Sequence, residues 1–222
     1  LKGKGDLILG NNVLAHVPDI KDFVKGVKIA LKPNGVNTFE FPHLCKLVEF
    51  NQFDTIYHEH FSYLSFTALK SIFESQGLEF FDVQELPTHG GSLRIFTKHI
   101  EDSSKSIESS VKAMLDKEKT LGVDTLAYYQ GFQEKTNKIK NDFISFLIEA
   151  KREGKKVVGY GAAAKGNTLL NYSGIKGQDL IEFVADASPY KQGKLLPGSR
   201  IPVFHPDKIN ENKPDFGSVI VY

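Results

Sequence analysis

The sequence has little of several residue types, and each shortage excludes a class of protein. It contains no tryptophan, one methionine and one cysteine, Cys45, among 222 residues. A single cysteine excludes a disulfide within the chain and suits a reducing compartment. No apolar run reaches transmembrane length, and no signal peptide opens the sequence. The sequence therefore predicts a cytoplasmic protein that does not associate with membranes.

Neither sign of charge is in excess. Lys and Arg together number 28 and Asp and Glu 27, which leaves a net charge of +1. This balance gives no electrostatic case for binding nucleic acid or an acidic membrane. A hydrophobic content of 41% with 17 phenylalanines is typical of a globular protein with one large or two small domains.

The most unusual stretch is residues 53–63, FDTIYHEHFSY, in which two histidines, two tyrosines and two carboxylates stand among apolar residues. Groups that exchange protons in an apolar setting are what a general acid–base site requires. An extended stretch would put Tyr57 and His60 on opposite faces. A turn at His58 would instead let these two side chains converge.

Two other interpretations of this stretch stay open. Clusters of tyrosine and histidine also occur in structural hydrogen-bond networks. His58, Glu59 and His60 are possible metal ligands, but HEH is not the helical HExxH spacing, and a His-x-His pair needs a third ligand. We therefore predict no metal site from the spacing.

The chain before this stretch predicts alternating strands and helices. Residues 6–10 form an apolar strand-like run that ends at Asn11 and Asn12, and Pro18-Asp19 opens a helical pattern. A turn at residues 33–35 and a strand at 36–41 complete a βαβ unit, which predicts a parallel sheet. Ligands bind at the carboxyl edge of such sheets, where both asparagines and residues 53–63 are expected.

The middle of the chain predicts a helix, a hairpin and a helical connector. Thr67 is placed to cap a helix over residues 67–76. Strands at 78–85 and 92–98 flank the short connection PTHGG and are expected to be antiparallel neighbours. Gly90-Gly91 either lets the backbone approach a ligand or serves as turn chemistry. Residues 103–151 then become helical and polar.

A second unit begins at residue 155 with KKVVGYGAAAKGNTLL. Gly159-x-Gly161-x-x-Ala164, between a strand and a helix, fits the G/A form of the dinucleotide fingerprint. The amides at the start of that helix favour phosphate, and Lys165 adds a positive charge. A strand at residues 181–185 ends at Asp186, which is placed for a ribose hydroxyl or for pairing with Lys165. Tight packing of strand and helix without a ligand is the alternative.

Five segments together resemble a known family: NNVLAHVPDI (11–20), FEFPHL (39–44), FDTIYHEHFSYLS (53–65), LPTHGGSLRIF (86–96) and GYGAAAKGNTLLNY (159–172). They resemble the S-adenosylmethionine-dependent sugar C-methyltransferases, which methylate a carbon next to a ketone in nucleotide-linked deoxysugars. The resemblance covers nearly the whole chain, and the five segments occur in the family's order.

The resemblance implies an α/β fold. Residues 1–102 would be the C-terminal half of a Rossmann-type methyltransferase sheet, 103–152 a helical connector, and 153–222 a truncated, second Rossmann-like domain that binds the nucleotide-sugar. The family's N-terminal zinc segment and its cofactor glycine loop have no counterpart in this sequence. Both ends of the sequence fall in strand-like runs, 6–10 and 218–222, so we expect a fragment of a longer protein.

The resemblance also implies roles for individual residues. His60 would be the catalytic base, with Tyr57 and Glu59 as neighbours and His16 lining the same pocket. The cofactor would be S-adenosylmethionine, with Asn11 and Asn12 on its side of the site. The partner would be a nucleotide-linked keto-sugar. The glycine turn at residues 159–166 would bind the diphosphate of that sugar nucleotide rather than a nicotinamide cofactor. The residues expected to bind it are Gly159, Gly161, Ala162, Lys165, Asn167, Thr168, Asp186 and Arg200.

The expected chemistry needs no metal. A neutral histidine removes the proton next to the ketone, and Tyr57 or a protonated His16 stabilises the enolate oxygen. Glu59 would orient His60 or raise its basicity. Two other functions stay open: a dehydrogenase that uses the second fingerprint for NAD, and a non-catalytic module that binds a nucleotide-sugar.

Overall fold

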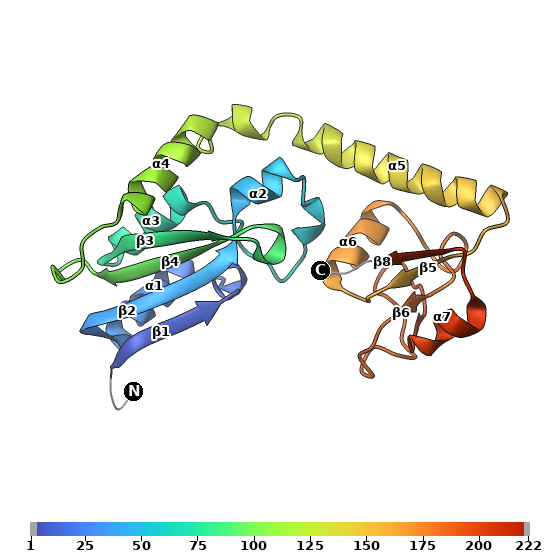
Figure 1. Ribbon diagram of the computed structural model, residues 1–222, viewed down its shortest axis with the longest axis horizontal. Helices are drawn as coiled ribbons and strands as arrows, with labels where there is room; N and C mark the ends of the chain where they lie inside the picture. Colours follow the sequence, from blue (N-terminus) through green and yellow to red (C-terminus); the bar gives the residue numbers. More distant parts are fainter. Residues whose placement is uncertain (1–3, 220–222) are drawn as a thin grey trace. The chain divides into compact units, whose positions relative to one another are not determined.

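The protein, described here by a computed structural model over residues 4–219, divides into two compact units (Figure 1). Unit 1 comprises the described residues of Leu1–Gln52 and His58–Phe132. Unit 2 comprises Phe53–Tyr57 and the described residues of Gln133–Tyr222. Every helix in the described part of the chain is too short or too polar to span a bilayer.

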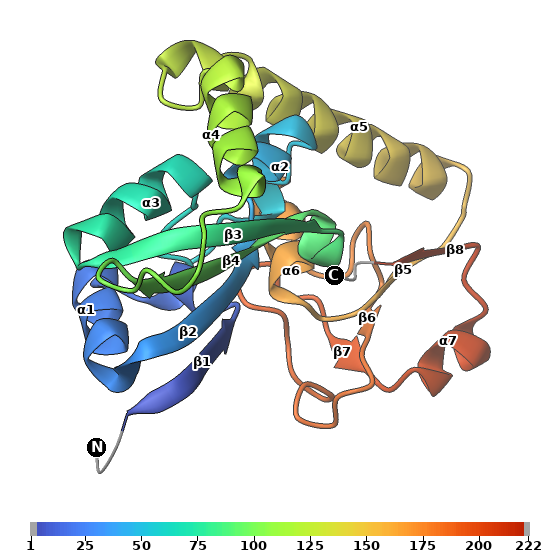
Figure 2. The same cartoon turned by 60° about the vertical axis from the view of Figure 1, so that its left-hand side comes forward.

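Unit 1 is built on a four-stranded mixed sheet in the order β1-β2-β4-β3 (Figure 2). Its strands are β1 (Gly5–Asn11), β2 (Leu31–Pro42), β3 (Leu78–Leu86) and β4 (Ser92–His99). β1 and β2 pair in parallel, which confirms the predicted βαβ unit, and β3 and β4 form the predicted antiparallel hairpin. β4 also pairs antiparallel with β2. This pairing brings the hairpin tip to the carboxyl edge of β1 and β2.

The turn predicted at residues 33–35 is wrong, because the structure includes these residues in β2. The pairing of β1 with β2 jumps from Gly5 opposite Leu31 to Leu7 opposite Val36, so the extra residues are absorbed as an irregularity within the strand. A Cβ at Gly35 would lie 2.7 Å from the Leu31 side chain and 3.0 Å from the Gly5 carbonyl oxygen. The close approach of β1 explains the glycine.

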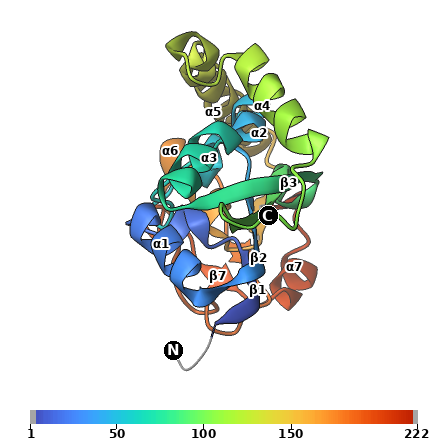
Figure 3. The same ribbon diagram turned by 90° about the vertical axis from the view of Figure 1, so that its left-hand side faces the viewer.

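Two helices, α1 (Ile20–Ala30) and α3 (Phe66–Ser75), cover one face of this sheet (Figure 3). Their inner residues pack on the strands in one hydrophobic core that includes Val24, Leu69, Phe39 and Ile95. Ser65 caps α3, since its hydroxyl accepts a hydrogen bond from the Ala68 amide at 3.1 Å. The predicted cap, Thr67, is therefore wrong: it lies inside the first turn.

The predicted helical connector is divided between the two units. α4 (Ser109–Leu121) belongs to unit 1, where Val111 and Met114 join the core beneath α3 and β3. α5 (Phe132–Arg152) contributes Leu147 and Ala150 to the core of unit 2. The short helix α2 (Leu44–Glu49) follows β2 in unit 1.

Unit 2 contains a four-stranded parallel sheet in the order β7-β6-β5-β8. Its strands are β5 (Val157–Tyr160), β6 (Val184–Ala185), β7 (Val203–Phe204) and β8 (Phe216–Val219). α5 and α6 (Ala164–Tyr172) pack against one face, and α7 (Asp207–Asn212) lies on the other through Ile209. The unit is thus α/β. The strand predicted at 218–222 begins earlier, at Phe216, and residues 220–222 lie outside the described part.

Candidate active site

Residues 53–63 do not form a strand. Phe53–Thr55 is a single 3-10 turn, and the chain turns again at His58 and Glu59. The structure therefore follows the turning interpretation of this stretch. Phe53–Tyr57 belongs to unit 2, where the Phe53 ring packs 5.3 Å from that of Tyr172 on α6, and the residues from His58 onward belong to unit 1.

Three aromatic side chains of unit 1 gather after the carboxyl end of β1. The centroids of the His16 and His60 rings lie 4.8 Å apart, and the Tyr63 ring stands edge-on to His60 at 6.1 Å. His16 comes from a 3-10 turn, Leu14–His16, that directly follows β1. The Phe61 amide donates to the Ala15 carbonyl at 2.8 Å, which fastens the two segments together.

The hydrogen bond of His16 fixes its tautomer. His16 Nδ1 lies 2.9 Å from the backbone carbonyl oxygen of Glu59, and a carbonyl only accepts, so Nδ1 carries the hydrogen. In the neutral ring Nε2 is then the proton acceptor. Glu59 thus takes part in this cluster through its backbone, while its side chain is exposed.

Asn12 connects the end of β1 to the tip of the β3–β4 hairpin. The backbone N–H of Asn12 donates to the backbone carbonyl of Glu40 at 2.8 Å, and the side-chain Nδ2 of Asn12 lies 2.7 Å from His89 Nε2. Asn12 Oδ1 is buried and has no hydrogen-bond partner in the described part of the chain. The asparagine predicted for cofactor binding is thus held at the sheet edge with one acceptor unused.

Glu40 on β2 holds the other side of the hairpin tip. Its carboxylate is buried, at 6% exposure, and accepts from the Thr88 hydroxyl at 2.7 Å and from Arg94 at 2.8 Å. The hydrogen bond from Thr88 lowers the pKa of Glu40, and Arg94 lowers it further against the opposing effect of burial. The sequence did not single out Glu40, Thr88, His89 or Arg94, although all four lie in segments that carry the family resemblance.

A second polar cluster of unit 1 is fully enclosed. Glu118 on α4 accepts from His43 Nε2 and from the Phe66 amide, both at 2.7 Å, through one oxygen. Its other oxygen accepts from the Thr67 amide at 2.8 Å and the Thr67 hydroxyl at 2.6 Å. Glu118 therefore satisfies the first amides of α3 from a different helix.

His43, Cys45 and Glu118 are close enough to be metal ligands, with their ligand atoms within 4.8 Å of one another. The donor set does not favour a metal. Both Glu118 oxygens already accept hydrogen bonds, and burial raises the pKa of the Cys45 thiol to about 11, so the thiol keeps its proton near neutral pH. We interpret the cluster as a buried hydrogen-bond network.

The glycine turn of unit 2 is held by backbone contacts. Gly161 has a φ of +92°, which favours glycine, and its amide donates to the Ala185 carbonyl at 2.7 Å. The next amide, of Ala162, donates to Asp186 Oδ2 at 2.7 Å. α6 begins two residues later, at Ala164, and has no side-chain cap. Its first amides are therefore the donors that an anion would meet.

Asp186 is committed to the protein. Besides Ala162 it accepts from the Ser188 amide at 2.8 Å, and Lys191 Nζ lies 3.2 Å from Oδ2. Burial raises the pKa of Asp186, but the two amides and Lys191 outweigh it, so the pKa lies below its usual value. The structure thus pairs Asp186 with Lys191, where the sequence predicted Lys165 as a possible partner.

The other residues predicted around this turn are spread along α6. Lys165 lies in the first turn, where its charge opposes the burial that raises the pKa of Asp54. The Thr168 hydroxyl donates back to the Ala164 carbonyl at 3.1 Å, and Asn167 Oδ1 is buried without a partner in the described chain. Arg200 lies in a loop whose Pro197 carbonyl accepts from Asn171, near the C-terminal end of α6. The backbone of Arg200 therefore lies at the end of α6 opposite to the glycine turn.

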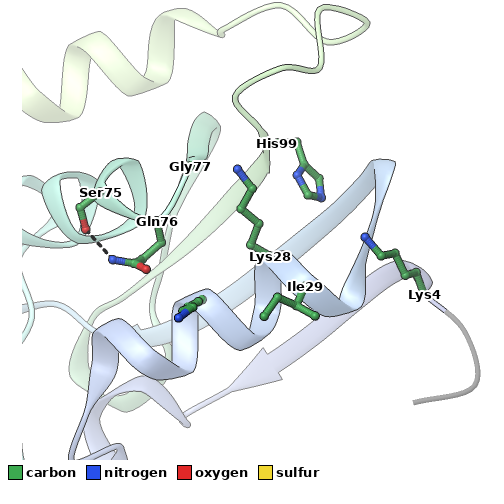
Figure 4. Close-up of a pocket in the computed structure, with 8 residues that line it drawn as sticks. Lys4, Lys28, Ile29, Ser75, Gln76, Gly77 and His99 are labelled. Carbon is green, nitrogen blue, oxygen red and sulfur yellow. Dashed lines mark hydrogen bonds between the residues drawn. The ribbon is translucent and has the colours of Figure 1, made fainter.

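A hollow of about 450 Å³ opens in unit 1 near the amino end of β2 (Figure 4). Its lining includes Lys4, Lys28, Gln76 and His99. Lys28 pairs with Glu101 at 3.2 Å, and the hollow lies at the C-terminal turns of α1 and α3, where helix dipoles disfavour anions. We do not assign the hollow to the active site.

Comparisons with known proteins match both parts of the chain to methyltransferase families. Residues 87–222 match the family described as the C-methyltransferase C-terminal domain, and residues 1–83 match a methyltransferase domain family. The chain is 38% identical over 214 residues to the C-methyltransferase NovU of Streptomyces niveus. That alignment covers 96% of this chain and 50% of NovU, so the chain spans about half the length of the curated relative it matches.

Solved structures give only partial likenesses. An S-adenosylmethionine-dependent methyltransferase from Clostridium acetobutylicum is 13% identical, covers 45% of this chain and 60% of its own, and has a TM-score of 0.36. Magnesium protoporphyrin IX methyltransferase from Synechocystis, with bound SAH, is 13% identical, covers 44% of this chain and 46% of its own, and has a TM-score of 0.35.

Proposed function

Because the chain belongs to the S-adenosylmethionine-dependent C-methyltransferase family, we propose that the protein methylates a carbon next to a ketone in a nucleotide-linked deoxysugar. The observation that carries the proposal is the grouping of His16, His60 and Tyr63 after the carboxyl end of a parallel strand pair. Ligands of open α/β sheets bind at that edge.

His60 acts as the base in this proposal. It removes the proton from the carbon next to the ketone, and the electron pair of the broken C–H bond becomes the enolate. His16, whose Nδ1 is already bonded to the Glu59 carbonyl, holds the second ring beside His60. Tyr57 and Glu59 complete the proposed set, with Tyr57 as a donor to the enolate oxygen and Glu59 as an orienting group.

Asn11 and Asn12 are the residues of this chain that we assign to the cofactor. The buried, unpartnered Oδ1 of Asn12 fits a ligand that carries a hydrogen-bond donor. S-adenosylmethionine supplies the electrophilic methyl group to the enolate carbon when it is bound.

Unit 2 holds the diphosphate of the nucleotide-sugar in this proposal. The first amides of α6, which has no side-chain cap, favour an anion, and Lys165 in the first helical turn adds a positive charge. Titration with thymidine or uridine diphosphate, and separately with NAD, tests this assignment. Tight NAD binding without any response to the pyrimidine diphosphates would favour a dehydrogenase instead.

The proposed base is tested by hydrogen exchange, which needs no methyl donor. The chain is incubated in heavy water with a thymidine-diphosphate-linked 4-keto-6-deoxyhexose, and deuterium beside the ketone is followed by mass spectrometry. His60→Asn is expected to slow exchange about a hundredfold or more. The neighbouring His58→Asn is the control and should retain the wild-type rate. Wild-type exchange in His60→Asn would reject the assignment of the base.

A further inference from the structure

The tip of the β3–β4 hairpin holds a histidine in a strained conformation. His89 has a φ of +53°, and Asn12, its partner across the sheet edge, has a φ of +54°. Both values lie in the left-handed region, which few residues other than glycine adopt, although asparagine and histidine do so more often than the rest. The two side chains meet at 2.7 Å although 77 residues separate them. Strain of this kind is found at functional sites, where the surrounding structure has to impose it.

Several other contacts already fasten the hairpin tip to the rest of unit 1. The Thr88 hydroxyl donates to Glu40, the Gln52 side chain donates to the Gly90 carbonyl at 3.0 Å, and the His43 amide donates to the Gly91 carbonyl at 3.0 Å. A further tie from His89 is therefore not needed to place the loop. The strained backbone instead presents the His89 ring at the carboxyl edge of the sheet.

The bond to Asn12 decides which nitrogen of His89 carries hydrogen. An amide nitrogen only donates, so His89 Nε2 accepts and the hydrogen of the ring lies on Nδ1. A protonated ring would carry hydrogen on both nitrogens and would lose this bond. In the neutral ring the donor is therefore Nδ1–H.

We propose that His89 is a further catalytic residue, whose Nδ1–H donates to the keto oxygen of the substrate and stabilises the enolate oxygen as charge develops there. A fixed neutral donor suits this task, because it does not have to lose a proton or reorient during the reaction. Asn12 is the positioning residue that sets the tautomer. Asn12 precedes His16 by four residues, so the Cα atoms of these two residues lie within about 14 Å of each other.

The inference rests on the proposed function, and the exchange reaction in heavy water tests both separately. The variants are chosen by which ring nitrogen they imitate. The amide of asparagine reaches about the place of Nδ1, whereas the longer glutamine reaches about the place of Nε2. His89→Asn should keep exchange within about tenfold of wild type. His89→Gln keeps the tie to Asn12 but loses the donor, and should slow exchange about a hundredfold or more with little change in substrate affinity.

A third variant inverts the donor without removing the tie. In Asn12→Asp the carboxylate can only accept, so His89 Nε2–H becomes the donor and Nδ1 of the neutral ring the acceptor. Because the new carboxylate also favours the protonated ring, whose Nδ1–H still donates, the comparison with wild type is made at about pH 9, where we expect exchange to fall at least tenfold. A structural tie would survive this change, since the two side chains still bond.

The outcomes separate the two proposals. Near wild-type exchange in His89→Gln, or equal losses in His89→Gln and His89→Asn with unchanged unfolding midpoints, would overturn the role of His89. Absence of exchange in the wild-type chain would contradict the proposed function itself, and the role of His89 with it. We expect hydrogen exchange to be fastest in wild type, slower in His89→Asn and slowest in His89→Gln.

Discussion

Each unit contains a buried carboxylate that accepts backbone amides, and the two differ in what surrounds them. Glu118 in unit 1 is 1% exposed and accepts hydrogen bonds from groups inside the protein: His43, Cys45, Phe66 and Thr67. Asp186 in unit 2 is 8% exposed, lies at the end of a strand, and holds the glycine turn through Ala162.

The difference shows that one interaction can serve two purposes. Glu118 joins α4 to the start of α3, so its loss acts on the stability of the fold. Asp186 fixes the amides before α6, whose N-terminus has no side-chain cap, so its loss acts on the proposed diphosphate site. In both cases the pKa of the carboxyl is lowered because hydrogen bonds outweigh burial.

The largest expected effect is on stability in Glu118→Gln. The glutamine NH₂ group would face amides that also donate, so buried donors would lose their acceptor. We expect a loss of about 3 kcal/mol or more in the free energy of unfolding, measured by urea denaturation. The control is Glu85→Gln, which removes the exposed pair with Lys117 and should change stability by less than about 0.5 kcal/mol. Equal losses in the two variants would contradict the structural role of Glu118.

A smaller effect on stability is expected in Asp186→Asn, together with an effect on binding. One of the two bonded amides would keep an acceptor, so the loss should be about 1–2 kcal/mol. Affinity for thymidine diphosphate, measured by calorimetry, should fall about fivefold because the turn is less well ordered. Unchanged affinity would show that Asp186 stabilises the unit without shaping the turn.

Lys165→Ala should leave stability nearly unchanged and weaken thymidine diphosphate binding about threefold to tenfold, the scale of one partly solvated charge contact. Arg200→Ala is the matched control, since Arg200 lies in the loop near the other end of α6. A larger loss in Arg200→Ala than in Lys165→Ala would move the diphosphate away from the glycine turn.

The smallest expected effect is a change with pH in the stability difference between wild type and the two carboxylate variants. Carboxyls whose pKa is lowered by folding stabilise the protein fully above the usual pKa, 4.5 for Glu118 and 3.8 for Asp186, and lose that contribution as the pH falls through the lowered value. The gap in stability between wild type and variant should therefore narrow below about pH 4.5 for Glu118→Gln and below about pH 3.8 for Asp186→Asn. Urea midpoints measured across this range check it, and a gap that widened would reverse the assigned sign.

Much of the fold could be predicted from local patterns. Apolar runs and helical periodicity gave β1, α1, α3, the β3–β4 hairpin and β5, because each depends on residues near one another in sequence. The strand order could not be predicted, since the placement of β4 beside β2 depends on pairing between residues such as Glu40 and Arg94. The extra residues within β2 resemble a turn in sequence for the same reason, because their place in the strand depends on pairing with β1.

The candidate site divides in the same way. Residues 53–63 could be singled out by composition alone, and the glycine turn by its spacing. Three other residues, His89, Glu40 and Glu118, could not be singled out. Each is identified by a hydrogen bond to a partner 48 to 77 residues away in the sequence. Once β4 is known to pair with β2, the hairpin tip necessarily meets the end of β1, and His89 becomes visible as a site residue.

β1 has a consequence for the behaviour of this chain in solution. Within the described residues it is an edge strand, and it carries Leu7 and Leu9 at 56% and 68% exposure on one side. An apolar edge of this kind is a template on which another strand can add. The net charge of +1 supplies little repulsion between copies. Leu9→Lys should therefore raise the concentration at which the 222-residue chain stays dispersed.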